Sequence, residues 1–233
     1  MSDHQNLAEA MEATELFGNL DMPTRLLIVK EMRPVAFTAG QSIFSRGDAG
    51  KELYYVTNGL VRLSILTAEG RELAFTHAGA GSIFGEIAML DGKARTADAT
   101  AVTKTEAMTL GQAALDRLLE SSWTFAKGLL RFMCARLREA DLQLEGVALH
   151  RIEVRLARFL LGRCQQHSDG EDADGLVTVS LGMSQGELAL LLGASRPKVN
   201  AALTLLEDQG TIRRDGSKIR CDFEDLKCLA EMD

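Results

Sequence analysis

The chain has 233 residues, of which 46% are hydrophobic and 25% are charged, and its formal net charge is −7 at pH 7. This composition is typical of a globular protein and argues against long disordered regions, and no run of eighteen apolar residues that could span a membrane occurs. The acidic N-terminus lacks the basic start and apolar centre of a signal peptide, and the four cysteines are scattered without metal-binding spacing. We therefore expect a cytoplasmic protein with reduced thiols, no bound metal and no membrane partner.

Residues 34–110 show the pattern of antiparallel β-structure, and a helix precedes them. In residues 14–32, Asp21 and Pro23 are positioned to begin that helix. Short apolar or alternating runs then recur roughly every 8–12 residues between glycine or polar turns, which predicts a sandwich or roll. The runs are VAFT, SIF, ELYYVT, LVRLSILT, ELAFTHA, ADATAVT and EAMTL.

A helical segment of almost thirty residues begins near Ser121. Its apolar positions are separated alternately by three and four residues, as in the seam of a coiled coil. These positions are Trp123, Ala126, Leu130, Met133, Leu137, Ala140, Leu144 and Val147. An amphipathic helix packed on its own domain is the alternative, but the narrow apolar stripe favours pairing with a second copy in a parallel dimer.

The remaining residues, from 150 onward, predict a winged helix-turn-helix. A helix (RIEVRLARFLLGRCQQ), an acidic turn-rich loop (HSDGEDADG) and a strand (LVTVSL) come first. Ser184 with Glu187 then forms a capping box, Gly193 ends that helix, and Ser195 with Pro197 begins a second one. The basic segment TIRRDGSKIRC predicts a hairpin with an Asp-Gly turn.

The second helix of this pair is expected to lie in the major groove of DNA, despite the acidic net charge of the whole chain. Arg196 can donate twice to guanine, Asn200 can pair with adenine, and Lys198 can contact a base or a phosphate. The expected phosphate contacts are Ser184, Gln185, Ser195, Arg213, Arg214 and Lys218. The alternative is a helix pair that merely packs, with its basic side chains solvated.

The segment FGEIAMLDGKARTA, residues 84–97, places two charges in an otherwise apolar stretch. Main-chain N–H groups near Gly85 can converge on an anion, Arg95 can offer two donors to a phosphate, and Glu86 can accept a hydrogen bond from a sugar hydroxyl. Alternatively, Glu86 and Arg95 pair with each other and close a turn, and residue chemistry alone leaves both arrangements open.

This segment resembles the phosphate-binding cassette of cyclic-nucleotide-binding domains, F-G-E-[LI]-A followed by R-[TS]-A. ELYYVTNGLVRLSILTAEGREL resembles the preceding hairpin of the same β-roll, and the helix-turn-helix resembles that of the cAMP receptor protein/fumarate–nitrate regulator (CRP/FNR) family of bacterial transcription factors. The resemblance covers essentially the whole chain. It implies an α+β fold with an antiparallel β-roll and N-terminal helices (1–120), a dimerisation helix (121–149) and a winged helix-turn-helix (150–233).

The resemblance also implies roles for individual residues. The matching phosphate, ribose and apolar contacts are Gly85, Glu86, Arg95, Thr96, Leu63 and Ile87, and Arg136 matches an arginine that approaches the glutamate. Ala140 and Asp141 depart from the threonine and serine that meet adenine in cAMP-responsive members. A carboxylate at 141 suits the two adjacent donors of guanine, and the Thr96 hydroxyl can reach its amino group, although Asp141 can equally be a solvated helix residue. The expected effector is cGMP, cAMP or both.

The implied function is a homodimeric regulator that binds a palindromic operator in double-stranded DNA and acts with RNA polymerase. A family member with a degenerate pocket, or with another effector, that binds DNA without a cyclic nucleotide is the alternative. No cysteine precedes Cys134, which argues against an iron–sulfur sensor, and His77 has no second ligand near it in sequence for haem. The absence of a P-loop, a metal-ligand cluster or a nucleophile–base pair in the sequence argues against an enzyme.

Overall fold

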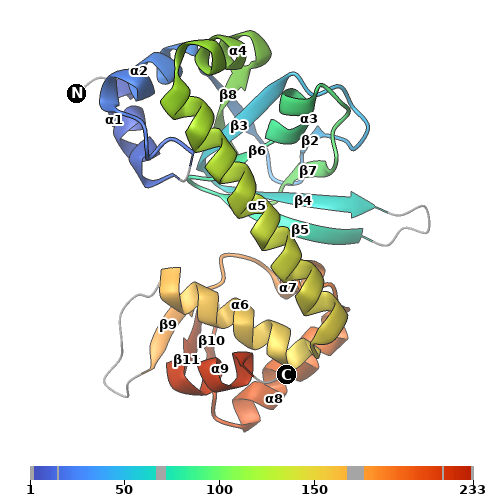
Figure 1. Ribbon diagram of the computed structural model, residues 1–233. Helices are drawn as coiled ribbons and strands as arrows, with labels where there is room; N and C mark the ends of the chain where they lie inside the picture. Colours follow the sequence, from blue (N-terminus) through green and yellow to red (C-terminus); the bar gives the residue numbers. More distant parts are fainter. Residues whose placement is uncertain (1–2, 15, 67–71, 167–175, 217, 232–233) are drawn as a thin grey trace. The chain divides into compact units, whose positions relative to one another are not determined.

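A computed structural model of the protein describes residues 3–14, 16–66, 72–166, 176–216 and 218–231. The chain divides into two compact units, Met1–Glu139 and Ala140–Asp233. The longest helix, α5 (Trp123–Leu149), begins in the first unit and ends in the second (Figure 1).

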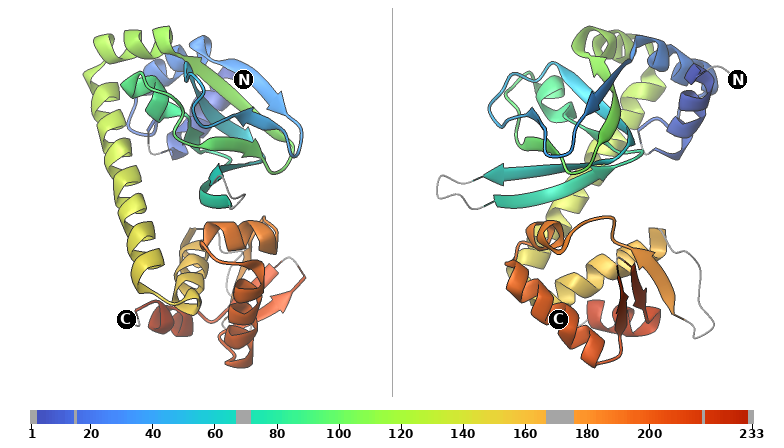
Figure 2. Two further views of the ribbon diagram at one scale, coloured as in Figure 1. Left: turned by 90° about the vertical axis from the view of Figure 1, so that its right-hand side faces the viewer. Right: turned by 180° about the vertical axis from the view of Figure 1, so that it is seen from behind.

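The first unit contains two four-stranded antiparallel sheets, with strand orders β1-β8-β3-β6 and β2-β7-β4-β5. Figure 2 shows these sheets from two further sides. The strands are β1 (Arg33–Phe37), β2 (Ser42–Phe44), β3 (Glu52–Asn58), β4 (Leu60–Leu66), β5 (Glu72–Gly79), β6 (Ile83–Phe84), β7 (Asp98–Ala101) and β8 (Thr105–Gly111). All seven expected strands and the roll are confirmed, whereas β6 was not predicted because two residues carry no periodicity.

Helices flank the strands of the first unit: α1 (Asp3–Ala10), the 3-10 turn η1 (Met11–Ala13), α2 (Met22–Glu31), α3 (Glu86–Asp91), α4 (Gln112–Ser121) and α5. The start of α2 is confirmed, because the Asp21 carboxylate accepts a 2.9 Å hydrogen bond from the N–H of Thr24 and Pro23 lies in the first turn. Helix α4 was not predicted. It follows β8 directly, and no side chain caps it at Gly111, so the sequence offers no start signal.

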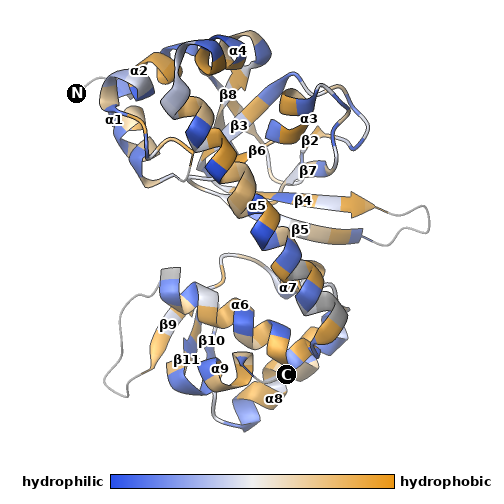
Figure 3. Ribbon diagram, viewed as in Figure 1, coloured by the Kyte–Doolittle hydropathy of each residue, from blue (hydrophilic) through white to orange (hydrophobic). Residues whose placement is uncertain are grey.

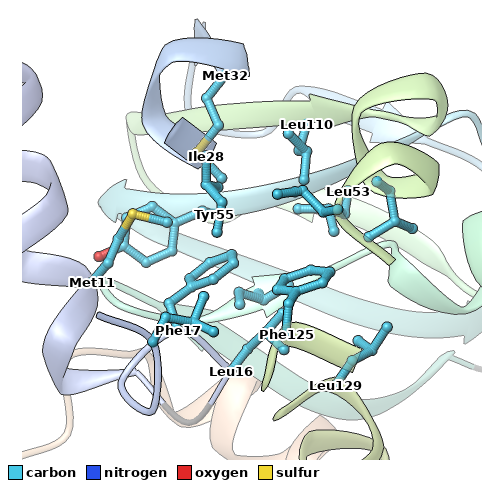
Figure 4. Packing of buried hydrophobic residues seen from close by; sticks show 14 of the residues in the cluster. Met11, Leu16, Phe17, Ile28, Met32, Leu53, Tyr55, Leu110, Phe125 and Leu129 are labelled. Atoms are coloured by element: carbon cyan, nitrogen blue, oxygen red, sulfur yellow. The ribbon is translucent and has the colours of Figure 1, made fainter. Parts of the chain in front are cut away.

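The strand β3 is buried on both faces. Leu53 and Tyr55 join a cluster with the helices, which also contains Phe17 and Phe125 (Figure 4). Tyr54 joins a second cluster whose members come from both sheets. Because successive side chains point to opposite faces of a strand, the continuous apolar run of β3 lets one strand serve both cores.

The second unit is a winged helix-turn-helix, as predicted. It contains α6 (Ile152–Gln166), β9 (Val177–Ser180), α7 (Gln185–Leu191), α8 (Arg196–Asp208), β10 (Ile212–Asp215), β11 (Lys218–Cys221) and α9 (Phe223–Ala230). The strands form an antiparallel sheet in the order β10-β11-β9, and the helices share one apolar core with it. The expected acidic loop, residues 167–175, lies outside the described residues.

The wing hairpin is confirmed, with one refinement of its turn. Asp215 is the last paired residue of β10 and lies opposite Lys218, so the connection begins at Gly216, whose φ is +59°. The next residue, 217, lies outside the described ranges. Helix α9 was not predicted, although Asp222 caps it by accepting a 3.0 Å hydrogen bond from the N–H of Asp225.

Candidate functional site

The cassette begins with a sharp turn between β6 and α3. Gly85 has a φ of +81° and occupies the N-cap position of α3, and Gly92 ends that helix with a φ of +69°. A Cβ atom at Gly85 would lie 2.7 Å from Nη1 of Arg95 and 3.3 Å from the oxygen of Glu52. Glycine is therefore required at position 85 both by the backbone angle and by the close approach of the arginine.

Arg95 returns into this turn and is almost fully buried, at 5% exposure. Its Nη1 donates to the carbonyl of Gly85 at 2.6 Å, and its Nη2 donates to the carbonyl of Glu52 at 2.8 Å. Its Cζ lies 4.1 Å from the centre of the Phe44 ring, a cation–π arrangement. The remaining nitrogen, Nε, is buried without a hydrogen-bond partner, and burial lowers the pKa of the guanidinium.

Glu86 is 3% exposed at the first position of α3. Burial raises the pKa of its carboxyl group, while its own backbone N–H and the positive charges of Arg136 and Arg95 act in the opposite direction. Within the described part of the chain, no ion pair joins Glu86 to Arg95. Of the two arrangements left open by the sequence, a direct pairing of these two charges is therefore not the one observed.

The other candidate residues of the first unit differ in how far they are buried. Leu63, on β4, belongs to the buried cluster between the sheets, whereas Ile87 and Thr96 are exposed. Arg136, on α5, forms a 3.0 Å ion pair with Glu139. Its positive charge also acts to lower the pKa of the Glu86 carboxyl group. The structure thus brings Gly85, Glu86, Arg95 and Arg136 together within the first unit.

Two further candidates lie on α5 at the beginning of the second unit. Ala140 and Asp141 are both exposed there. Their side chains are free of the packing that fixes the cassette residues. Both residues also lie outside Met1–Glu139, the unit that carries the cassette.

Sequence reasoning missed the residues that hold Arg95 in place. Phe44 lies under the guanidinium, Tyr54 is stacked on Phe84 with ring centres 4.9 Å apart, and the Glu52 carbonyl accepts from Nη2. The only available signal was the alternation along ELYYVT, which places residues 52 and 54 on one face of β3.

The helix-turn-helix forms at the predicted positions. The Ser184 hydroxyl accepts a 3.2 Å hydrogen bond from the N–H of Glu187, and Gly193 turns the chain with a φ of +60°. Ser195 occupies the N-cap position of α8 and Pro197 lies in its first turn, although the Ser195 side chain makes no capping hydrogen bond.

The predicted DNA-contacting residues lie mostly on the surface of this unit. Arg196, Lys198 and Asn200 are exposed on the first turns of α8, while Val199 and other apolar residues of α8 are buried. Ser184, Ser195, Arg213, Arg214 and Lys218 are also exposed, and Gln185 is half-buried. The N-terminal turns of α8 and the wing therefore present basic and amide groups on the surface of this unit.

Arg214 donates to several residues of α8. Its Nε lies 2.7 Å from Glu207, and the two residues form an ion pair between the wing and α8. Weaker contacts of 3.5 Å and 3.4 Å reach Asn200 and Thr204. Among the expected phosphate contacts, Arg214 is thus held against α8.

Apolar and polar residues alternate along helix α5 (Figure 3), and its apolar residues divide into a buried and an exposed set. Phe125, Leu129 and Phe132 are buried in the core of the first unit. Four large residues of the predicted seam, in contrast, are between 61% and 76% exposed: Trp123, Leu130, Leu137 and Leu144. A fifth, Met133, is partly buried against the core of the first unit. The last seam position, Val147, lies outside the residues whose side chains are described.

None of the helices in the described ranges is long and apolar enough to cross a bilayer. In the same ranges, no three or more His, Cys, Asp or Glu side chains gather to form a metal site.

Comparison with known proteins matches each unit to a described domain. Residues 34–122 match the cyclic nucleotide-binding domain, and residues 154–231 match the Crp-like helix-turn-helix domain. A cyclic nucleotide-binding domain followed by a Crp-like helix-turn-helix domain is the domain order of a class of DNA-binding transcription regulators.

Full-length relatives make the assignment more specific. The chain is 32% identical over 203 residues to the cyclic AMP receptor protein of Thermus thermophilus, covering 87% of this chain and 90% of that protein. It is 29% identical over 211 residues to a CRP-like cAMP-activated global transcriptional regulator of Mycobacterium tuberculosis, covering 91% and 93%. Among solved structures, a CRP/FNR transcriptional regulator of Thermus thermophilus matches with a TM-score of 0.67 and 30% identity, covering 86% and 99%. FixK2 from Bradyrhizobium japonicum shares the fold, with a TM-score of 0.77, 21% identity, and coverage of 87% and 98%. The chain belongs to the CRP/FNR family.

Proposed function

We propose that this protein is a cytoplasmic, homodimeric regulator that binds cAMP or cGMP through the cassette and a palindromic operator in double-stranded DNA through α8. We propose residues 1–120 as the nucleotide-binding part, 121–149 as the dimerisation helix and 150–233 as the DNA-binding part. RNA polymerase is the expected partner at the promoter.

The observation that carries the nucleotide assignment is the pair of buried, opposite charges that do not neutralise each other by contact. The Nε of Arg95 is a buried donor without a partner, and Glu86 is a buried carboxylate whose pKa is raised by burial. Such groups are costly unless a ligand or a partner satisfies them. A cyclic phosphate with its ribose supplies both requirements, because it is an anion next to a hydroxyl donor.

The residues of the first unit fit this ligand. Arg95 is assigned to the cyclic phosphate, Glu86 to the ribose hydroxyl, and Gly85 to the close approach of the backbone. Thr96, exposed beside Arg95, is assigned to the phosphate or to a purine amino group. Leu63 and Ile87 are proposed apolar contacts and Arg136 a partner of Glu86 when the nucleotide is bound.

The choice between cAMP and cGMP rests on different observations. Relatives described as cAMP receptors or as cAMP-activated favour cAMP. The exposed carboxylate of Asp141 and the exposed hydroxyl of Thr96 suit the adjacent donors of guanine. Ala140 lacks the hydroxyl through which the threonine of cAMP-responsive members meets adenine.

For DNA binding, we propose that the N-terminal turns of α8 enter the major groove, where Arg196 donates to guanine and Lys198 contacts a base or a phosphate. Ser184, Gln185, Ser195, Arg213 and Lys218 are proposed phosphate contacts that set the register. The exposed apolar seam of α5 supports the dimer, because a row of large apolar side chains is stabilised by pairing with an identical row.

Calorimetric titration of the full chain with cAMP and with cGMP, followed by titration of operator DNA with and without each nucleotide, tests this function. We expect micromolar or tighter binding of at least one nucleotide and an operator affinity that changes when it binds. Operator binding without any nucleotide binding would instead establish the alternative, a family member whose pocket does not use a cyclic nucleotide. Asp141→Ala should weaken cGMP more than cAMP if Asp141 meets guanine.

A further inference from the structure

One residue of the wing, Arg214 of β10, bonds α8 at several points. Both its backbone N–H, at 3.1 Å, and its Nε, at 2.7 Å, donate to the carboxylate of Glu207. Nη1 lies 3.5 Å from Oδ1 of Asn200, and Nη2 lies 3.4 Å from the hydroxyl of Thr204. Residues 200, 204 and 207 are four and three positions apart, so they form one face of α8 that the guanidinium follows.

This arrangement constrains the amide of Asn200. A guanidinium carries only donors, so the group that Asn200 turns toward Arg214 must be its carbonyl oxygen. The NH₂ group is then the part of the amide that remains for another partner. Because the backbone N–H and the Nε of Arg214 both donate to Glu207, the guanidinium is held in place. Its position in turn sets the direction of the Asn200 oxygen.

The orientation has a consequence for base recognition. An asparagine that reads adenine in the major groove uses both ends of its amide: the oxygen accepts from N6 and the NH₂ donates to N7. The amide oxygen keeps a second lone pair, but the contact with Arg214 turns this oxygen toward the wing, so the NH₂ donors are the part of the amide that is left to meet a base edge. They match the acceptors of guanine, N7 and O6, and the O4 of thymine, and they face the N6 donors of adenine unfavourably.

We infer that Arg214 is a positioning residue that makes Asn200 select a base with acceptor atoms, guanine or thymine, instead of adenine. The inference rests on the proposed binding of α8 in the major groove. It gives Arg214 a role different from that of its neighbour Arg213, which is exposed and is assigned to phosphate.

Selection of binding sites from a random DNA library by the full-length protein, with saturating cyclic nucleotide, tests this role. Asn200→Ala first identifies the base position that depends on residue 200. At that position, the unchanged protein should select guanine or thymine, and Arg214→Met should raise the relative affinity for adenine about tenfold, because the complete amide becomes available.

Two variants separate positioning from a simple phosphate contact. Arg214→Lys keeps the charge but cannot hold Glu207 and Asn200 together, so it should show the same shift toward adenine while retaining more of the overall affinity. Arg213→Met, the matched control on the same strand, should weaken binding to all sequences and reduce its salt dependence, with no change in base preference. Thermal unfolding of each variant establishes that the winged domain is folded.

Selection of adenine by the unchanged protein at the position that depends on residue 200 would overturn the inference. It would equally be overturned if Arg214→Met weakened all sequences alike and Arg214→Lys restored them, because that is the behaviour of a phosphate contact. Failure of the unchanged protein to select any sequence, with cAMP, with cGMP or alone, would instead overturn the proposed function.

Discussion

Arg95 donates from Nη2 to the main-chain oxygen of Glu52, which lies 43 positions earlier in the sequence and 2.8 Å away in space. A second bond, 2.6 Å long, runs from Nη1 to the oxygen of Gly85. The arginine that we assign to the cyclic phosphate therefore also connects β3 with the turn that begins α3. Ligand binding and the local stability of the roll depend on the same side chain.

Replacing Arg95 tests both roles together. Arg95→Leu should abolish detectable nucleotide binding and should also lower the free energy of unfolding of the ligand-free protein by about 1–3 kcal/mol for each carbonyl left without its donor. Calorimetry measures the first effect and denaturant unfolding the second. Circular dichroism at low temperature should still show a folded protein. Nucleotide affinity equal to that of the unchanged protein would rule out the assignment of Arg95.

Glu86 should make the stability of the protein depend on pH. Burial raises the pKa of its carboxyl group in the folded state above the ordinary value of 4.5, so folding binds a proton. The stability associated with this proton is fully present below pH 4.5 and is lost as the pH rises through the raised pKa. Glu86→Gln should therefore stabilise the ligand-free protein near pH 7. It should also make the free energy of unfolding depend less on pH in this range.

The same substitution should weaken nucleotide binding, because the amide is a poorer acceptor for the ribose hydroxyl than a carboxylate. Thermal unfolding at pH 5 and pH 8, together with calorimetry, distinguishes the two effects. A less stable Glu86→Gln variant at pH 8 would show that another partner satisfies the carboxylate.

Gly50 should tolerate no side chain because it lies against both the cassette helix and Arg95. A Cβ atom there would be 2.4 Å from the Cβ of Ala88 and 3.0 Å from Nε of Arg95. Gly50→Ala should destabilise the protein by about 1–3 kcal/mol and weaken nucleotide binding, since α3 or Arg95 must move. In the matched control Gly79→Ala, the nearest atom to the new Cβ is 3.8 Å away, so stability should change by less than about 0.5 kcal/mol. Equal effects of the two substitutions would contradict the close packing at Gly50.

The exposed seam of α5 should control assembly without affecting the fold of one protomer. Leu137, 64% exposed, makes little contact within its own chain, so Leu137→Glu should yield a folded monomer in sedimentation experiments. Leu27 on α2 is exposed to a similar extent, 58%, outside the seam, and Leu27→Glu should leave the dimer intact. A dimer that persists in the Leu137→Glu variant would show that another surface joins the protomers.

Local signals were sufficient to predict most elements of this fold. Turn glycines delimit the strands of the roll, and Asp21 and Ser184 mark helix starts through hydrogen bonds to nearby backbone groups. Helix α4 escaped prediction because Gly111 provides no capping side chain and the helix follows a strand without a break. Patterns of this kind depend on residues close in sequence, which is why they can be read without a structure.

The candidate site was predictable only in part. The Gly-Glu and Arg-Thr steps indicated an anion site, but the bonds of Arg95 to the Glu52 carbonyl and its contact with Phe44 depend on strands distant in sequence. The same limit applies to Arg214, which sequence reasoning assigned to a phosphate and the structure places against Glu207. A basic residue in a sequence shows its charge but not which of its donors are already occupied.

The two apolar faces of α5 have a consequence for the cell. One face, with Phe125 and Phe132, completes the interior of a single protomer, while Leu130 and Leu144 on the other face are exposed and would be covered in the dimer that we propose. A protomer produced in small numbers would expose this row for longer than one produced in abundance. If the dimer is the form that binds DNA, as we propose, the number of copies per cell sets how many pairs exist, and the level of expression of the gene is itself an input to the promoters that bind it.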